Sequence, residues 1–91
     1  MKKIIIDFNG CRTYHKFHQI LKESFDFPNY YGENLDALWD CLDNYCDFDL
    51  IVEIKGFNSL PKELKQYIPK VMNVFDDVTE STPNIKFVII S

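Results

Sequence analysis

Three short apolar runs, set well apart along the chain, constrain the fold of this sequence more than any other feature. They lie at residues 2–8, 50–55 and 85–90 and are rich in isoleucine. Near-continuous apolar runs of this length are typical of parallel strands that are buried on both faces. The long segments between them carry apolar residues at helical spacing, so we expect right-handed helical crossovers. The sequence therefore predicts an α/β fold, a small three-stranded parallel sheet with helices packed against it.

Two helices are expected between the first and second runs. Thr13 can cap a helix over residues 14–25, because its side chain can accept from the free N–H groups of the first turn. A loop over residues 26–33 then leads to a second helix, for which Asn34 is the expected N-cap and Gly32 supplies the backbone freedom at the entry. The apolar stripe of this second helix is Leu35, Leu38, Cys41, Leu42 and Tyr45.

Two further helices are expected between the second and third runs. Ser59 can cap a short one that has Pro61 in its first turn. Pro69 is expected to begin a separate helix that ends near residue 80, because proline is well tolerated at the start of a helix and breaks hydrogen bonds within one.

A length of 91 residues predicts a single domain over residues 1–91, too small for a second lobe around a deep cleft. No apolar run approaches 18 residues, so no membrane span is expected. The start of the chain has only three isoleucines before Asp7 and no small-residue cleavage site, which does not fit a signal peptide. We therefore expect a cytoplasmic protein.

The charges of the chain are distributed very unevenly. Residues 24–54 contain none of the ten Lys and Arg residues and eight of the fourteen acidic ones. These eight are Asp26, Glu33, Asp36, Asp40, Asp43, Asp47, Asp49 and Glu53. An acidic block of this kind attracts a basic partner and argues against nucleic-acid binding, which needs the opposite charge.

The second expected helix concentrates this charge at a cost to its own stability. Asp36, Asp40 and Asp43 share one face, and like charges at these spacings each oppose the helix by roughly 0.2–0.5 kcal/mol. Aromatic side chains are interleaved with the carboxylates, a combination that is common in protein interfaces. They are Tyr30, Tyr31, Trp39 and Tyr45. The stretch is therefore predicted to bind a protein, although a solvated acidic face is the simpler alternative.

Catalysis and metal binding are weaker interpretations of the same residues. Asp36 and Asp40 stand one turn apart, but no His, Lys, Arg or Ser accompanies them in the helix, so we expect no enzyme. The acids after residue 42 lack the glycine and the terminal glutamate of a calcium loop, and Cys11 with the two histidines lacks a fourth zinc ligand. An odd count of three cysteines favours free thiols. We expect no cofactor and no metal.

The run from Tyr30 to Leu42, YYGENLDALWDCL, resembles the signature of the barstar family, intracellular inhibitors of barnase-type ribonucleases. The resemblance extends more weakly over the whole chain. It includes the Lys-Lys-Ile start, the His18-Gln19 pair, Pro28, the Val74-Phe75 pair and the closing Ile-Ile-Ser.

The resemblance implies a barstar-like fold and assigns roles to particular side chains. In the family, the acidic helix and its preceding loop plug the active site of a guanylyl-specific ribonuclease, with carboxylates in place of RNA phosphate. Asp40 then enters the phosphate site, Asp36 pairs with an Arg on the guanine side, and Tyr30 stacks on the catalytic His. Gly32, Asn34 and Trp39 line the contact. Asp77 stands where the family usually has Glu and reaches a further Arg with a shorter arm.

Some positions depart from the family pattern. Asp43 stands where Thr is usual, Tyr45 where Trp is usual, and Asp49 replaces a proline, while Cys11 and Cys46 are additional. Asp43 and Tyr45 nevertheless belong to the predicted partner-binding surface, and their identity bears on which ribonuclease is recognised.

The function predicted from the sequence is inhibition of a basic, secreted, barnase-like ribonuclease by a monomer that forms a 1:1 complex and protects the producing cell. One alternative is an acidic immunity or interaction module for another basic toxin or regulator. A second alternative is a metal-binding protein or a carboxylate enzyme, which predicts a bound divalent ion or turnover by the purified chain.

Overall fold

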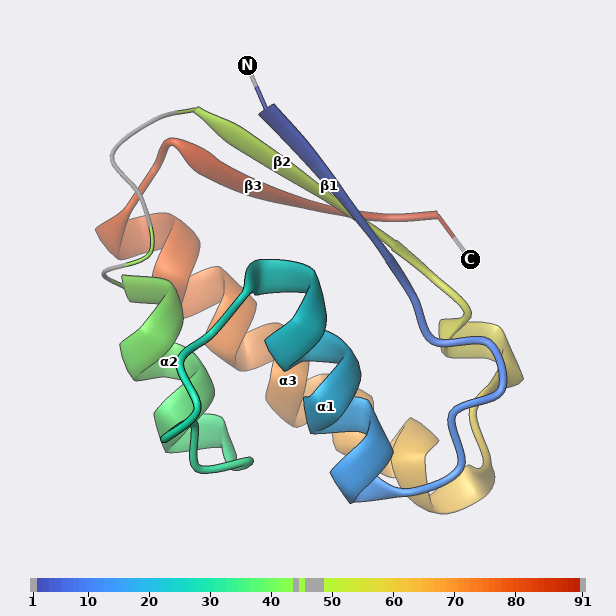
Figure 1. Ribbon diagram of the computed structural model, residues 1–91. Helices are drawn as coiled ribbons and strands as arrows, with labels where there is room; N and C mark the ends of the chain where they lie inside the picture. Colours follow the sequence, from blue (N-terminus) through green and yellow to red (C-terminus); the bar gives the residue numbers. More distant parts are fainter. Residues whose placement is uncertain (1, 44, 46–48, 91) are drawn as a thin grey trace.

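A three-stranded parallel sheet forms one layer of the structure, a computed structural model that describes residues 2–43, 45 and 49–90. The strands are β1 (Lys2–Asp7), β2 (Leu50–Lys55) and β3 (Ile85–Ile89), in the order β1-β2-β3 (Figure 1). Both pairings are parallel, and Val52 in the central strand lies opposite Ile4 on one side and Phe87 on the other. The predicted strand number, direction and approximate bounds are confirmed.

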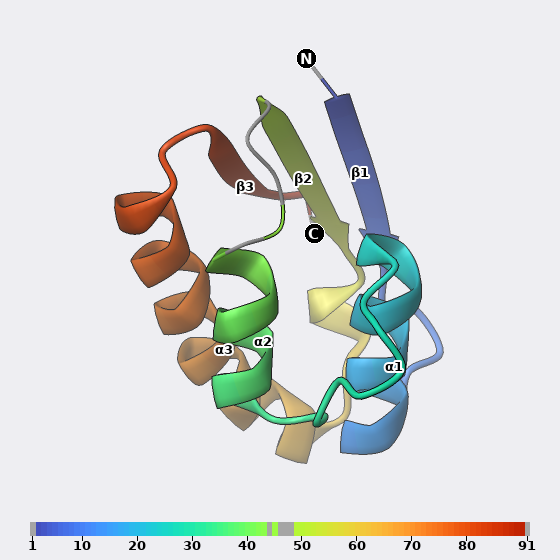
Figure 2. The same ribbon diagram turned by 60° about the vertical axis from the view of Figure 1, so that its left-hand side comes forward.

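The helices are α1 (Tyr14–Phe25), α2 (Leu35–Asp43) and α3 (Lys62–Ser81), with a short 3-10 turn η1 (Phe57–Ser59). All three α-helices cover the same face of the sheet (Figures 1 and 2). The expectation of strands buried on both faces is therefore wrong. Ile5 is 53% exposed and Val88 41% exposed, because nothing in the described part of the chain covers the other face.

A second expectation is also wrong. In place of a short helix near Pro61 and a separate helix beginning at Pro69, the structure has the single helix α3 of 20 residues. Pro61 is its N-cap, and Pro69 lies inside the helix and does not begin a new one. The buried face continues across the proline, from Leu64 before it to Val71 after it. Burial of both halves of this face against the core offsets the hydrogen bond that proline cannot donate, which local helix rules do not capture.

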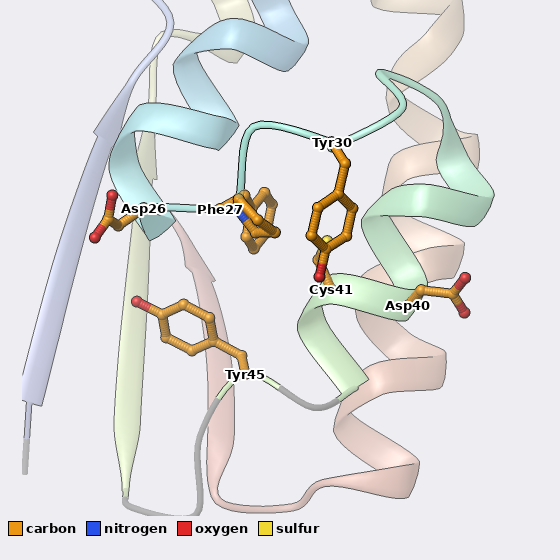
Figure 3. A pocket seen from close by; sticks show the side chains of 7 residues that line it. Asp26, Phe27, Tyr30, Asp40, Cys41 and Tyr45 are labelled. Carbon is orange, nitrogen blue, oxygen red and sulfur yellow. The ribbon is translucent and has the colours of Figure 1, made fainter.

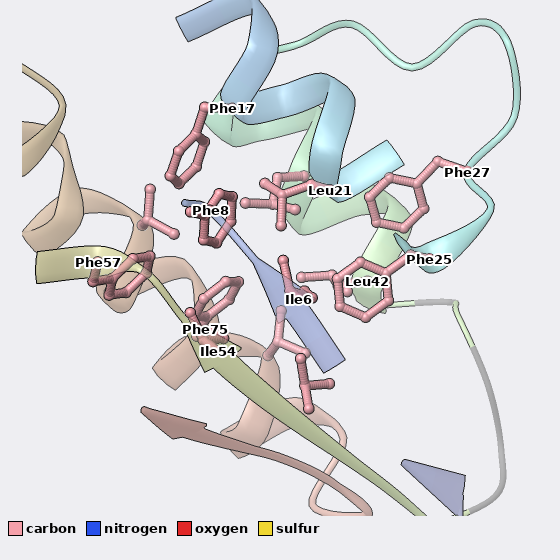
Figure 4. Close-up of a cluster of buried hydrophobic side chains, with 14 of the residues drawn as sticks. Ile6, Phe8, Phe17, Leu21, Phe25, Phe27, Leu42, Ile54, Phe57 and Phe75 are labelled. Carbon is pink, nitrogen blue, oxygen red and sulfur yellow. The ribbon is translucent and has the colours of Figure 1, made fainter. Parts of the chain in front are cut away.

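The core between the helices and the sheet is built largely from phenylalanine and aliphatic side chains (Figure 4). Phe8, just beyond β1, is fully buried and stacks on Phe17 of α1, with the ring centroids 4.5 Å apart. Leu38 and Leu42 anchor α2 in the same core and are fully buried. The acidic helix is thus a fixed part of the fold and not a loosely attached segment.

None of the helices in the described part of the chain is long and apolar enough to span a membrane.

Candidate partner-binding site

The entry to α2 is fixed by local hydrogen bonds around Asn34. The backbone N–H of Ala37 donates to Asn34 Oδ1 at 2.8 Å, as an N-cap requires, and Asn34 Nδ2 donates to the carbonyl of Gly32 at 3.1 Å. The predicted cap is confirmed. The left-handed residue, however, is Glu33 with a φ of 52°, whereas Gly32 has no positive φ. A Cβ on Gly32 would meet Asn34 Nδ2 at 3.2 Å, so Gly32 provides room for the capping side chain.

α2 presents its acidic side to solvent and its apolar side to the core. Asp36 and Asp40 are exposed, Asp43 and Trp39 are half-buried, and the helix packs against α3. Of the residues that the structure describes, none forms an ion pair with these three aspartates. The helix therefore carries three carboxylates that have no cationic partner in this part of the chain.

An open hollow of about 400 Å³ lies between the end of α1, the following loop and α2 (Figure 3). Its lining residues are Asp26, Phe27, Pro28, Tyr30, Asp40, Cys41 and Tyr45. The ring of Tyr30 points from the loop toward Cys41, while the carboxylate of Asp40 points away from the hollow at its edge (Figure 3). An aromatic recess thus adjoins an exposed anion, an arrangement that can receive an apolar or aromatic group next to a cation.

The structure brings some of the predicted site residues together and leaves others apart. Tyr30, Asp40 and Tyr45 meet at the hollow. Asp36 and Asn34 lie on the first turn of α2 and at its cap, outside the hollow. Asp77 is exposed on α3 and does not line the hollow either. Cys46 and Asp47 lie outside the described residues.

The two thiols that the structure describes are free, as expected. Cys11 is buried, and burial raises its pKa. Cys41 is half-buried at the hollow, where burial and the neighbouring charge of Asp40 both raise its pKa. Both thiols are therefore protonated and weakly nucleophilic at neutral pH. The described residues contain no group of three or more acidic, His or Cys side chains that could hold a metal.

Sequence reasoning missed a polar network behind the site. His18 of α1 is only 1% exposed, whereas His15 on the same helix is exposed. His18 Nδ1 lies 2.7 Å from the hydroxyl of Tyr31, and its Nε2 lies 2.9 Å from the hydroxyl of Tyr67. The helical spacing of His18 with Leu21 and Phe25 was the available signal, since it places His18 on the apolar stripe.

The burial of His18 is expected to make the stability of the protein depend on pH. Burial lowers the pKa of His18 below its ordinary value of 6.5, and the charge of Glu33 opposes that shift only in part. The unfolded chain then binds the proton more readily than the folded chain, so stability is lost as pH falls through the unfolded pKa. We expect the free energy of unfolding to decrease between pH 7 and pH 5, by at most about 1.4 kcal/mol per pH unit from this group.

Urea unfolding at half-unit steps of pH measures this dependence. His18→Gln should flatten the profile in this range, while His15→Gln, which changes the exposed histidine of the same helix, should keep the loss that is due to His18. A slope that survives in His18→Gln would show that another group is responsible.

Comparison with known proteins shows which family this chain resembles over its length. Residues 1–90 match the family model described as "Barstar (barnase inhibitor)". The chain is also 41% identical over 80 residues to "Putative ribonuclease inhibitor YrdF" of Bacillus subtilis (strain 168), and the match covers 88% of each chain.

Proposed function

This chain belongs to the barstar family of ribonuclease inhibitors, and we propose that it blocks a guanylyl-specific, barnase-type ribonuclease by placing α2 and its preceding loop over the active site. The observation that carries this mechanism is the exposed carboxylate of Asp40, which has no cation beside it in the described structure and adjoins the exposed ring of Tyr30. A ribonuclease active site is built to bind an anion between basic groups. A fixed carboxylate can occupy that position through charge-assisted hydrogen bonds.

In this proposal the site residues take the roles that the family resemblance implies, and their places in the structure are compatible with those roles. Asp40 occupies the phosphate position, and Asp36, one turn earlier on the exposed side of α2, pairs with an Arg near the guanine site. Tyr30 is 85% exposed, so its ring can stack on the catalytic His of the enzyme without any movement of the core. Gly32 allows the partner to approach the loop closely, and Asn34 holds the loop at the helix entry.

The remaining site residues surround this centre. Trp39 is half-buried on α2, and Tyr45 is half-buried in the hollow just beyond the helix; both supply apolar contact area. In the proposal, Asp43, half-buried at the end of α2, and Asp77, exposed on α3, pair with further basic groups of the enzyme. Their departures from the usual family residues are expected to affect which ribonuclease binds best.

The acidic block of residues 24–54 also speeds the encounter. A surface of one charge sign raises the rate of association with an oppositely charged partner, and this effect weakens with salt. We propose a complex of one inhibitor with one ribonuclease, formed inside the cell before the enzyme is exported.

Titration of the purified chain into a barnase assay tests the proposal. Cleavage of a guanosine-containing RNA substrate should fall linearly with added protein and reach its minimum at one equivalent. The Asp40→Ala variant, which leaves the rest of the acidic block in place, should inhibit much less. If barnase and a panel of other guanylyl-specific ribonucleases keep full activity in a tenfold excess of the chain, the proposal is wrong, and an interaction with another basic protein takes its place.

A further inference from the structure

The two adjacent tyrosines of the loop before α2 have opposite environments. Tyr30 is 85% exposed, whereas Tyr31 is 7% exposed and packs its ring near those of Phe27 and His18. The backbone N–H of Tyr31 also donates to the carbonyl of Pro28 at 3.0 Å, which closes a turn. The buried ring of Tyr31 therefore determines how the chain presents Tyr30.

The hydroxyl of Tyr31 is held by a chain of hydrogen bonds that leads away from the surface. It lies 2.7 Å from His18 Nδ1, and His18 Nε2 lies 2.9 Å from the hydroxyl of Tyr67 on α3. A neutral imidazole has one donor and one acceptor nitrogen, and a tyrosine hydroxyl can serve as either, so both bonds form in either tautomer. At 1% exposure, His18 has no water to replace a lost partner.

The far end of this chain is itself well fixed. The ring of Tyr67 makes edge contacts with Tyr14 and Phe17 of α1, at centroid distances of 4.9 Å and 5.7 Å. Tyr67 is half-buried and is not one of the residues that line the hollow beside Asp40. The hydrogen bonds that connect Tyr67 to the loop run through His18 to Tyr31.

A second contact ties the same loop to α1. His15 Nδ1 lies 2.7 Å from Glu33 Oε1, on an exposed part of the helix. Glu33 has a φ of 52°, a conformation that non-glycine residues seldom adopt unless their surroundings hold them. The loop runs back along α1 from the end of the helix toward its start (Figure 2). The His15–Glu33 and His18–Tyr31 contacts attach the loop to this helix.

We propose that His18 and Tyr67 are positioning residues for inhibition, which hold the loop in its binding shape through Tyr31. This role rests on the proposed function, since the loop carries Tyr30, Gly32 and Asn34. A loop that is already ordered loses little conformational freedom on binding, so the hydrogen-bond chain improves affinity without touching the ribonuclease. If the hydrogen-bond chain is broken, the loop must lose its conformational freedom during binding, which lowers the affinity.

The sharpest test removes one hydroxyl that is not part of the proposed interface. Tyr67→Phe keeps the ring contacts and deletes the bond to His18 Nε2. We expect it to weaken binding to barnase about fivefold, as does Tyr31→Phe, which cuts the chain at the loop. In a Tyr30→Ala background the effect of Tyr67→Phe should shrink to about twofold or less, because the most exposed side chain that the loop presents is gone.

A matched control separates positioning from stability. Val78→Ala removes buried volume further along α3 and destabilises the fold without changing the loop or its hydrogen-bond chain. At a temperature where every variant is fully folded, Val78→Ala should bind barnase as tightly as the parent chain. If the hydroxyl variants also bind like the parent, or if Val78→Ala weakens binding as much as they do, the positioning role is refuted.

Hydrogen exchange on the free protein provides a readout that does not depend on any ribonuclease. Tyr67→Phe should speed exchange of the amide hydrogens over residues 30–33 more than Val78→Ala does. If the parent chain inhibits no ribonuclease and this local difference is present, the proposed function fails while the loop tether stands. If the difference is absent, the tether fails whatever the outcome of the inhibition assay.

Discussion

Asp40→Ala should weaken the complex with the ribonuclease by about 2–5 kcal/mol, almost entirely through faster dissociation. In the free protein this carboxylate is exposed and has no ion-pair partner among the described residues, so its removal breaks no such contact. In the proposed complex the same carboxylate is removed from water and surrounded by basic groups. Those groups lose their partner when the side chain is truncated, which is why the loss is large.

A distant acidic residue is the matched control for this substitution. Glu23→Ala removes the same charge from an exposed position on α1, outside the proposed interface. It should lower the association rate slightly, with an effect that fades as salt is added, and leave dissociation unchanged. Stopped-flow association and competition dissociation at two salt concentrations distinguish the two variants. If Asp40→Ala and Glu23→Ala weaken binding equally, and only by lowering the association rate, then α2 is only a solvated acidic face.

Asp40→Ala is also expected to leave the free inhibitor at least as stable as the parent chain. Asp36 and Asp43 lie four residues before and three residues after Asp40 on α2, so each repels it across one turn. Removing the central charge relieves both repulsions, by a few tenths of a kcal/mol each. Urea unfolding of the free variant measures this gain. A clear loss of stability would mean that Asp40 supports the fold, and the binding data would then need a different interpretation.

Local patterns were sufficient to predict most of the secondary structure, because the relevant rules act over a few residues. Thr13 caps α1 by accepting from the N–H of Lys16, and Asn34 caps α2 in the same way. The direction of the strands followed from the long helical segments between them, because parallel strands need a long crossover whereas a hairpin needs only a short turn. These features depend on sequence spacing and backbone chemistry alone.

Features set by tertiary packing could not be predicted in this way. Pro69 looked like a helix start, and only the continuous buried face of α3 explains why the helix passes through it. Apolar strands suggested two covered faces, but whether a second layer exists depends on where the helices dock. The acidic and aromatic pattern pointed to a protein-binding stretch, and the family resemblance supplied the roles of its residues. Helical spacing marks His18 as a residue of the apolar stripe, but it does not identify the partners of His18, which are far apart from it in sequence.

Two of the chain's glycines also differ in this way: one is favoured by its local backbone conformation alone, and the other by tertiary packing as well. Substitution of the second gives the largest effect on stability that we expect. Gly10 and Gly56 both have positive φ, at 84° and 89°, which favours glycine at either position. A Cβ on Gly10 would meet nothing within 4 Å. A Cβ on Gly56 would lie 2.6 Å from the backbone nitrogen of Asn9 and 2.9 Å from the carbonyl carbon of Phe8. The end of β2 thus passes directly against the chain that leaves β1.

Gly56→Ala should therefore lower the free energy of unfolding by about 2–5 kcal/mol, and Gly10→Ala by only about 1–2 kcal/mol. Both substitutions bear the cost of a left-handed alanine. Gly56→Ala must also displace the backbone beside Phe8, whose buried ring stacks between Phe17 and Phe57 and whose N–H donates to the carbonyl of Lys55. Urea unfolding at 25 °C measures both losses, and equal values would show that β1 can move away from Gly56 without disturbing the core that supports the binding surface.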